Sequence, residues 1–454
     1  MKLVFNSILT LSLGILIFFG LKSSSSNKLK TTEFNVNTSS LNTTTTVTTQ
    51  EIIDLANAFK ATLTASQITT LQLSYSLTNA RTWSNLPASM SARLGLKMGT
   101  LTAPQLAAAK ALVQAMTGTP IGEGYNEVQG LWAADDYLSV NGGGTNYGAG
   151  NFYISFFGTP AMTGTFEIQM TGHHRTVSNT YINGNLVGAT PSFVATEPYA
   201  SFTSGGNTYQ PMLEEKTALV NMLSGLTATQ LTTAHLTTTF TDIVCGPQKD
   251  WMFPTTKVGL QANTLTASQK QLILNAIATY VNDVDDTSAA TFMTQYTAEI
   301  DNTYIVYSGT ATLNNQNDYI RIDGPSVWIE YSTQNGIILS PKHPHSIWRD
   351  HAKDYGGTGA PLSTTNFSLA SRIANFPNPV TENTTFNFNL KESAIVKINL
   401  YDLHGKLVVT PYKNSLNAGN NSLTVDLSDL SSGTYIYFIE TNGVRSNSSK
   451  LIKK

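Results

Sequence analysis

Apolar residues recur at helical spacing behind four copies of the string Leu-Thr-Ala-x-Gln. The copies begin at Leu63, Leu101, Leu226 and Leu265. In each copy the threonine can cap the first free backbone amides, and the glutamine three residues later can reach back to it, which is a capping box. The pattern therefore predicts four helix starts, arranged as one pair followed by a similar pair.

A second pattern, of alternating and aromatic-rich segments that end at glycine, follows each pair of helices and is typical of β-strands. The matching segments are 151–159 and 302–310, then Phe166–Thr171 and Tyr319–Asp323, then Val177–Ile182 and Val327–Tyr331. Their recurrence in the same order predicts an internal duplication, with halves at about 55–186 and 218–337. Because the strands follow one another directly, we expect an α+β domain over residues 51–357, in which capped helices pack on antiparallel strand meanders. The strands would form one sheet or two facing sheets.

The end of the chain has short alternating strands with turn formers and no helix between them. The expected strands are Thr385–Leu390, Ile395–Tyr401, Lys406–Thr410, Ser422–Leu427 and Thr434–Glu440. This spacing predicts a small β-sandwich over residues 373–454. The weakly patterned residues 358–372 before it predict a linker.

The beginning of the chain is typical of an exported protein. Lys2, the apolar run Ile8–Leu21 and the serines that follow predict a signal peptide over residues 1–26, with a single N-terminal anchor helix as the alternative. Residues 27–50, rich in threonine, serine and asparagine, predict a flexible leader that cannot build a core. We therefore expect no stable membrane insertion of the mature protein.

Composition narrows the possible functions. Only 12% of the residues are charged and the net charge is −2, which gives no electrostatic footprint for nucleic acid. The chain lacks a P-loop and a G-x-G-x-x-G motif, so we expect no nucleotide cofactor. A single cysteine, Cys245, excludes an intramolecular disulfide and a cysteine-based zinc site. It follows two aliphatic residues, which favours a buried thiol.

The histidines carry the strongest chemical signal. Five of seven fall in two short clusters, one at His173 and His174 and one that includes His343 and His345. On a strand, the H-x-H spacing places His343 and His345 on one face, as a donor pair for Zn²⁺ or Cu²⁺, whereas the adjacent His173 and His174 would point to opposite faces. Because the clusters occupy non-equivalent positions in the two halves, we expect one shared site with a single zinc or copper ion. The alternative is that some histidines are packing or loop residues.

Four charged residues are candidates for catalytic or supporting roles. Glu214 and Glu215 open a helix expected over Leu213–Leu223, where they either stabilise the helix N-terminus or complete the metal shell as ligand or general base. Arg349 and Asp350 follow Trp348 and can form an ion pair that orients the histidine segment.

Several segments along most of the chain match the pattern of a known domain family. The matching segments include Phe152–Gly158, Gly172–His174, Glu197–Pro198, Asp301–Tyr304, Tyr319–Pro325 and His343–Asp350. Residues from about 48 to 357 resemble the domain of unknown function DUF3500, which implies no established activity. The chain has Arg175 where members usually carry an apolar residue, and Pro344 where they often have isoleucine.

The C-terminal segment carries a second resemblance. Phe376–Pro379, Tyr401–Lys406, Leu430–Tyr435 and the lysine-rich end resemble a type IX secretion system sorting domain of the Bacteroidetes type. This resemblance implies that the type IX machinery handles residues 373–454. It also implies passage through the periplasm, a secreted or cell-surface location and, usually, removal of the tag.

Two functions remain open at this point. The first is a metal-dependent enzyme acting on an unknown extracellular substrate, hydrolytic with zinc or oxidative with copper, that uses the histidines as ligands. The second is a non-catalytic extracellular protein that binds a peptide or glycan through aromatic residues such as Trp132, Trp328 and Trp348.

Overall fold

The computed structural model describes residues 47–339, 341–357, 370–390, 393–403, 405–441, 444–446 and 448–454. The predicted signal peptide, most of the predicted leader and most of the predicted linker lie outside these residues, as does His404. The helix α1 (Thr49–Ala61) already includes the last two residues of the predicted leader. Within the described ranges, no helix combines the length and the apolar character that a membrane crossing needs.

The described residues form eight further α-helices, and the sequence predicts the starts of five of them. They are α2 (Ala65–Leu71), α3 (Leu77–Ala80), α4 (Ala103–Ala115), α5 (Gly124–Leu138), α6 (Leu213–Ser224), α7 (Ala228–Ala234), α8 (Ala267–Val281) and α9 (Asp286–Ala298). Short turns of other helix types are η1 (Met98–Thr100), η2 (Ser139–Gly143), η3 (Gly144–Asn146), η4 (Ala149–Asn151), η5 (Ala262–Thr264), η6 (Ile300–Asn302) and η7 (Asp354–Gly357). The four predicted capping boxes are confirmed at the starts of α2, α4, α7 and α8. The helix expected to start at Leu213 is confirmed as α6.

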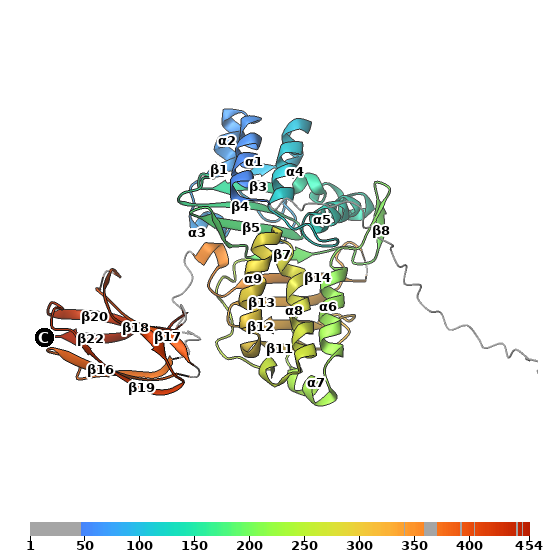
Figure 1. The fold of residues 1–454 in the computed structure, drawn as a ribbon. Helices are drawn as coiled ribbons and strands as arrows, with labels where there is room; N and C mark the ends of the chain where they lie inside the picture. Colours follow the sequence, from blue (N-terminus) through green and yellow to red (C-terminus); the bar gives the residue numbers. More distant parts are fainter. Residues whose placement is uncertain are drawn as a thin grey trace, which may run out of the picture. The chain divides into compact units, whose positions relative to one another are not determined.

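One mixed sheet carries the larger part of the protein (Figure 1). Its strands are β1 (Gln72–Leu73), β2 (Leu96–Lys97), β3 (Tyr153–Phe157), β4 (Thr165–Gly172), β5 (Arg175–Ile182), β6 (Asn185–Gly188), β7 (Ser192–Ala195), β10 (Leu260–Gln261), β11 (Tyr304–Ser308), β12 (Tyr319–Asp323), β13 (Val327–Gln334) and β14 (His343–Asp350). The order is β1-β3-β4-β5-β7-β14-β13-β12-β11-β10, with β2 beside β3 and β6 beside β5. The β8 (Phe202–Ser204) and β9 (Asn207–Tyr209) strands form a separate hairpin. Of the two predicted arrangements, the structure therefore has the single sheet.

The antiparallel pair β7 and β14 joins the earlier and the later strands in the middle of this sheet. Figure 1 shows α6, α8 and α9 lying across the strands from β14 to β11. Ile273, Ile277 and Tyr280 form the buried face of α8 and pack in one core with Ile305 and other strand residues. A separate core joins α1 and α4 to β3, β4 and β5. The two halves of the sheet thus have their own apolar cores.

Similar contacts occur in two separate parts of the large domain. The side chain of Gln105 donates to the Thr62 carbonyl at 2.9 Å and bonds to Gln67, and the side chain of Gln269 donates to the Gly225 carbonyl at 2.9 Å and bonds to Gln230. Two glycines also correspond. Gly95 has φ +91° and Gly259 has φ +93°, and a Cβ on either would meet the carbonyl oxygen of a neighbouring strand at 2.2 Å and 2.5 Å.

The C-terminal region is rich in strands. Its strands are β15 (Ala370–Phe376), β16 (Asn383–Leu390), β17 (Ala394–Tyr401), β18 (Leu407–Leu416), β19 (Gly419–Asp426), β20 (Gly433–Thr441), β21 (Val444–Arg445) and β22 (Ser449–Lys453). They form two sheets, of β15-β16-β19 and of β18-β17-β20 with β21 and β22, that share one apolar core. The five expected strands are all present, and the sequence pattern missed β15, β21 and β22.

Candidate metal centre

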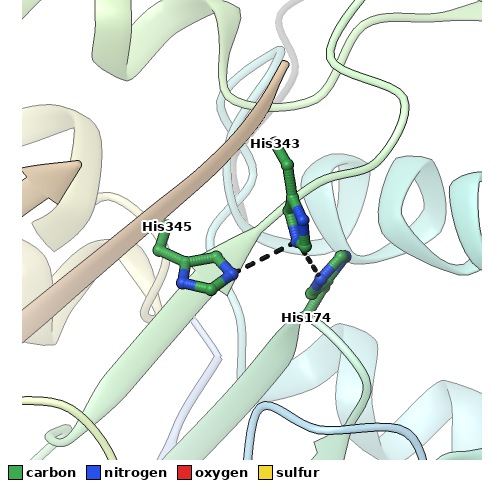
Figure 2. A group of neighbouring side chains, drawn as sticks. All are labelled: His174, His343 and His345. Atoms are coloured by element: carbon green, nitrogen blue, oxygen red, sulfur yellow. Dashed lines mark hydrogen bonds between the residues drawn. The ribbon is translucent and has the colours of Figure 1, made fainter. Parts of the chain in front are cut away.

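Three imidazole rings converge in the middle of the large sheet. His174, His343 and His345 each direct a ring nitrogen toward the others, and these ligand atoms all lie within 4.8 Å of one another (Figure 2). Nε2 of His343 lies 2.6 Å from Nε2 of His174 and 3.2 Å from Nε2 of His345. In the part of the chain that the structure describes, this is the only group of histidines, cysteines and carboxylates with such spacing.

Two different backbone features deliver these rings. His343 and His345 alternate on β14, the strand at the junction of the two halves, and Pro344 between them is accommodated within the strand. His174 lies in the two-residue turn between β4 and β5 and has φ 70°, in the left-handed region. Since β5, β7 and β14 are successive in the sheet, the turn ends beside β14. The structure therefore assembles one group from segments 169 residues apart.

Carboxylates stand behind two of the three rings. Oε2 of Glu197 lies 3.6 Å from Nδ1 of His343, and Oδ1 of Asp242 lies 2.9 Å from Nδ1 of His345. Glu197 is itself held by the backbone amides of Ile338, at 2.7 Å, and Leu339. A carboxylate at Nδ1 favours the proton there and leaves Nε2 free as a ligand, as behind histidines that bind metals.

Burial sets the charge state of the ligands. His174 is 4% and His343 3% exposed, and burial lowers the pKa of both rings well below the ordinary value, with neighbouring imidazoles lowering it further. The side chain of His345 is 12% exposed and marks the side of the group that is nearest to solvent. Neutral imidazole is the form that binds a metal ion, so the site is prepared for a cation at neutral pH.

His173 does not join the three converging rings. Its ring stacks on that of His174, with centroids 3.4 Å apart, and its Nδ1 lies 2.5 Å from Oδ1 of Asp135 on α5. Tyr147 packs edge-on against the other side. The expectation that His173 and His174 point in opposite directions is wrong, because both lie in a tight turn and not on a strand.

The predicted carboxylates Glu214 and Glu215 belong to another part of the fold. Glu215 is fully buried at the start of α6, where Glu123, Glu127 and Asp283 act on its charge, and Glu214 is half-buried and lines two cavities. Neither is a member of the histidine group.

Arg349 and Asp350 do not pair with each other. Arg349 is fully buried and forms ion pairs with Asp250 at 3.0 Å and Asp354 at 2.8 Å. Asp350 accepts hydrogen bonds from the Tyr296 hydroxyl and from the backbone amides of Ala352 and Lys353. Successive residues of a strand point to opposite faces, which is why the expected ion pair is wrong.

The aromatic residues expected to bind a peptide or glycan are not on the surface. Trp132 is 5% exposed, and Trp328 and Trp348 are fully buried, with indole N–H groups that donate to Glu330 and Tyr296. Cys245 is buried as expected, and burial raises the pKa of its thiol.

Sequence reasoning missed the carboxylates around the histidines. Asp135, Glu197 and Asp242 are separated from the rings they contact by 38, 146 and 103 residues. No local motif marks Asp135 or Asp242. Glu197 belongs to the pattern that resembles DUF3500, and nothing in its spacing links it to His343.

Comparisons with known proteins cover nearly all of the described chain. Residues 45–357 match the model of the family described as "Protein of unknown function (DUF3500)". Residues 374–454 match that of the "Secretion system C-terminal sorting domain". No curated protein is similar enough to the chain to count as a match.

Proposed function

The chain belongs to the DUF3500 family, and we propose that it is a metalloprotein with one zinc or copper ion bound by His174, His343 and His345. The sorting domain at residues 374–454 indicates a secreted or cell-surface protein, handled by the type IX secretion machinery. The ion would therefore be acquired and used outside the cytoplasm, where the function is exerted.

The convergence of three Nε2 atoms within 4.8 Å is the observation that carries this proposal. Isolated buried histidines are ordinarily satisfied by hydrogen bonds to unlike groups, whereas here three acceptor nitrogens face one another. A shared metal ion removes that conflict because each neutral ring can donate a lone pair to it.

Three protein ligands favour a catalytic over a structural role. Structural zinc sites have four protein ligands, while catalytic sites have three and keep one position for water or substrate. Such an ion supplies Lewis acidity and, for copper, electron transfer. The chain itself positions the rings, through Glu197 and Asp242, and keeps His174 and His343 neutral by burial, which lowers the pKa of both. We therefore favour a metal-dependent hydrolase or oxidoreductase.

Metal analysis of protein purified without a histidine tag tests the proposal. We expect about one equivalent of zinc or copper per chain, present as isolated or after addition of the ion and dialysis. The double variant His343→Ala/His345→Ala should lose it, and His235→Ala, which alters an exposed histidine elsewhere, should retain it. Full occupancy in the double variant would disprove the ligand assignment, and no stoichiometric metal in the wild type would favour a binding protein.

We also infer an internal duplication of the unit that spans about 55–186 and 218–337. The recurring capping glutamines and the corresponding Gly95 and Gly259 support this inference. Superposition of the Cα atoms of the two segments is the direct check, and a fit that aligned neither the capped helices nor the three-strand meanders would contradict it.

We also propose boundaries for the signal peptide, the functional domain, the linker and the sorting domain. Residues 1–26 would be removed on export, residues 51–357 would form the functional domain, and residues 358–372 would link it to the sorting domain at 373–454. Mass spectrometry of the secreted form would show whether both terminal segments are absent.

A further inference from the structure

A second buried polar group lies in the core of the large domain, around Arg175. The guanidinium forms an ion pair with Asp283, at 2.8 Å from Nη2 to Oδ2, and lies 3.5 Å from Oε2 of Glu127. Glu215 and Glu123 complete the group, and all four carboxyls are less than a tenth exposed. We call Glu123, Glu127, Glu215, Asp283 and Arg175 the carboxyl cluster.

The carboxyl cluster has more acids than its one cation can neutralise. Four carboxylates face a single guanidinium, so full ionisation would bury a surplus of negative charge, which is strongly unfavourable. Burial, followed by the charges of the neighbouring acids, raises the pKa of Glu127 and Glu215 well above the ordinary value and that of Glu123 to about 10. The cluster must therefore hold protons or a further positive charge.

Two cavities open onto the cluster. One, of about 510 Å³, is lined by Glu127 and Glu214, and the other, of about 450 Å³, by Glu123 and Glu214. Glu214 thus stands at the wall between them. Among the described residues that line the two cavities there is no lysine, arginine or histidine.

Buried oxygens without partners line both cavities. Neither carboxylate oxygen of Glu127 accepts a hydrogen bond from an N–H or hydroxyl group within the described ranges, and the same is true of Oε2 of Glu123. Glu127 does lie within hydrogen-bonding reach of the carboxyl group of Glu215. Both residues are more than nine-tenths buried, at 3% and 5% exposed. Native proteins rarely leave such atoms unsatisfied, so these oxygens need either a bound proton or a donor from outside the chain.

We propose that the cavities beside the carboxyl cluster bind an organic cation, namely an ammonium or guanidinium group on an aliphatic chain. The charged group would hydrogen-bond to Glu127 and Glu214, which supplies the positive charge that the cluster lacks. Ile121, Leu213 and the ring of Tyr209 also line the first cavity and fit the aliphatic part of such a ligand.

A metal ion fits this place less well. No three carboxyls of the cluster place their oxygens within 4.8 Å of one another, as the three histidines do with their ring nitrogens. The apolar walls also have no role around a small hydrated ion, whereas they match a lysine- or arginine-like side chain or an aliphatic amine.

This site shares no side chain with the metal centre, although His174 and Arg175 are consecutive in the chain and α5 carries both Glu127 and Asp135. Glu127 lies near the start of the helix and Asp135, which holds His173, near its end. At 1.5 Å of rise per residue the two positions are about 12 Å apart along the helix axis. The proposal therefore does not depend on whether a metal binds.

Calorimetric titration of the full-length protein with a matched pair of ligands tests the proposal. N-acetyl-lysine amide carries the ammonium group, and N-acetyl-norleucine amide has the same aliphatic chain without it. We expect saturable binding of the lysine derivative, also in about 0.15 M salt. Binding should release protons, so the measured binding enthalpy should vary with the ionisation enthalpy of the buffer. The norleucine derivative should bind at least about tenfold more weakly.

Two variants and a control locate the binding. Glu127→Gln and Glu214→Gln should each weaken binding of the lysine derivative about tenfold or more. Glu167→Gln removes another buried carboxyl, one that lines neither cavity, and should leave the affinity unchanged. If Glu127→Gln fails to fold, Glu214→Gln carries the test, since that side chain is only half-buried.

Three results would overturn the proposal. They are equal binding of the two derivatives, unchanged affinity in the two cavity variants, and absence of binding both by N-acetyl-lysine amide and by N-acetyl-arginine amide, which carries the guanidinium group, up to about 20 mM. Metal content measured on the same samples keeps the two sites distinguishable, because cavity variants that retain full metal leave the proposed function untouched.

Discussion

The histidine centre and the carboxyl cluster are both buried groups of ionisable side chains. They differ in the hydrogen-bond and ion-pair partners that the chain supplies to them. In the histidine centre, two rings have a carboxylate at Nδ1 and all three direct Nε2 inward. In the carboxyl cluster, four acids share Arg175 and several oxygens have no donor among the described residues. Burial lowers the pKa of His174 and His343 and raises that of Glu127 and Glu215.

The two groups are connected through the backbone. His174 and Arg175 are consecutive, at the end of one hairpin, so one residue enters each group. The difference teaches that buried polar residues can indicate a ligand when the hydrogen-bond partners of each of their atoms are counted separately. Convergent lone pairs indicate a small ion, and dispersed unsatisfied oxygens beside a cavity indicate a larger cationic ligand.

The largest expected effect comes from removal of the one cation in the carboxyl cluster. Arg175→Met should destabilise the protein by about 3–5 kcal/mol at pH 7, because it leaves buried acids without a partner. Chemical denaturation followed by circular dichroism measures this loss. A change below about 1 kcal/mol would show that the acids are already neutral and that Arg175 is dispensable.

The same variant has a defined pH dependence. The three glutamates of the cluster have raised pKa values in the folded protein, so between the ordinary value of 4.5 and the raised values the folded state binds more protons than the unfolded state. Stability from these groups is complete below pH 4.5 and falls as the pH rises through that window. Loss of Arg175 raises the pKa values further, so the destabilisation should be larger at pH 8 than at pH 5. The reverse order would contradict the assignment.

An intermediate effect, on metal affinity, is expected from changing Glu197, the carboxylate beside the metal ligand His343. Glu197→Gln should lower the affinity for zinc or copper about 10- to 100-fold, because the amide cannot support the ring as a carboxylate does. Competition with a chelator of known affinity measures the change. Unchanged affinity would mean that the backbone alone orients His343.

The smallest effect on metal affinity is expected from changing Asp242, the carboxylate beside His345. Asp242 is 46% exposed, whereas Glu197 is 1% exposed, and solvent weakens the electrostatic support that a carboxylate gives. Asp242→Asn should therefore lower metal affinity by less than about tenfold in the same assay. A larger loss than in Glu197→Gln would reverse this ranking and identify Asp242 as the main support.

Local sequence patterns predicted the local structure well. The capping boxes, the glycine-bounded strands and α6 are determined by residues a few positions apart, and these are present in the structure. The pairing of β7 with β14 was not predictable, since it joins strands about 150 residues apart, and the sequence left open whether one sheet or two would form.

For the candidate site, residue chemistry was easier to predict than geometry. The spacing of His343 and His345 indicates a shared face, but the stacking of His173 on His174 depends on a hairpin turn that the adjacent spacing of the two residues does not reveal. The partners of Glu215 and Arg349 come from distant segments, so the roles expected for them could not be derived from neighbours in the sequence.

The position of β14 has a consequence for how the protein matures. His174 and His343 are 169 residues apart, and they meet only after β14 has paired with β7. Closing so long a loop is a slow step of folding, since its entropy is lost before its contacts form. A metal ion bound there would link the earlier and the later strands of the sheet, each of which packs in its own apolar core, and would oppose their separation. Occupancy of the centre would then report that an exported chain has completed its fold.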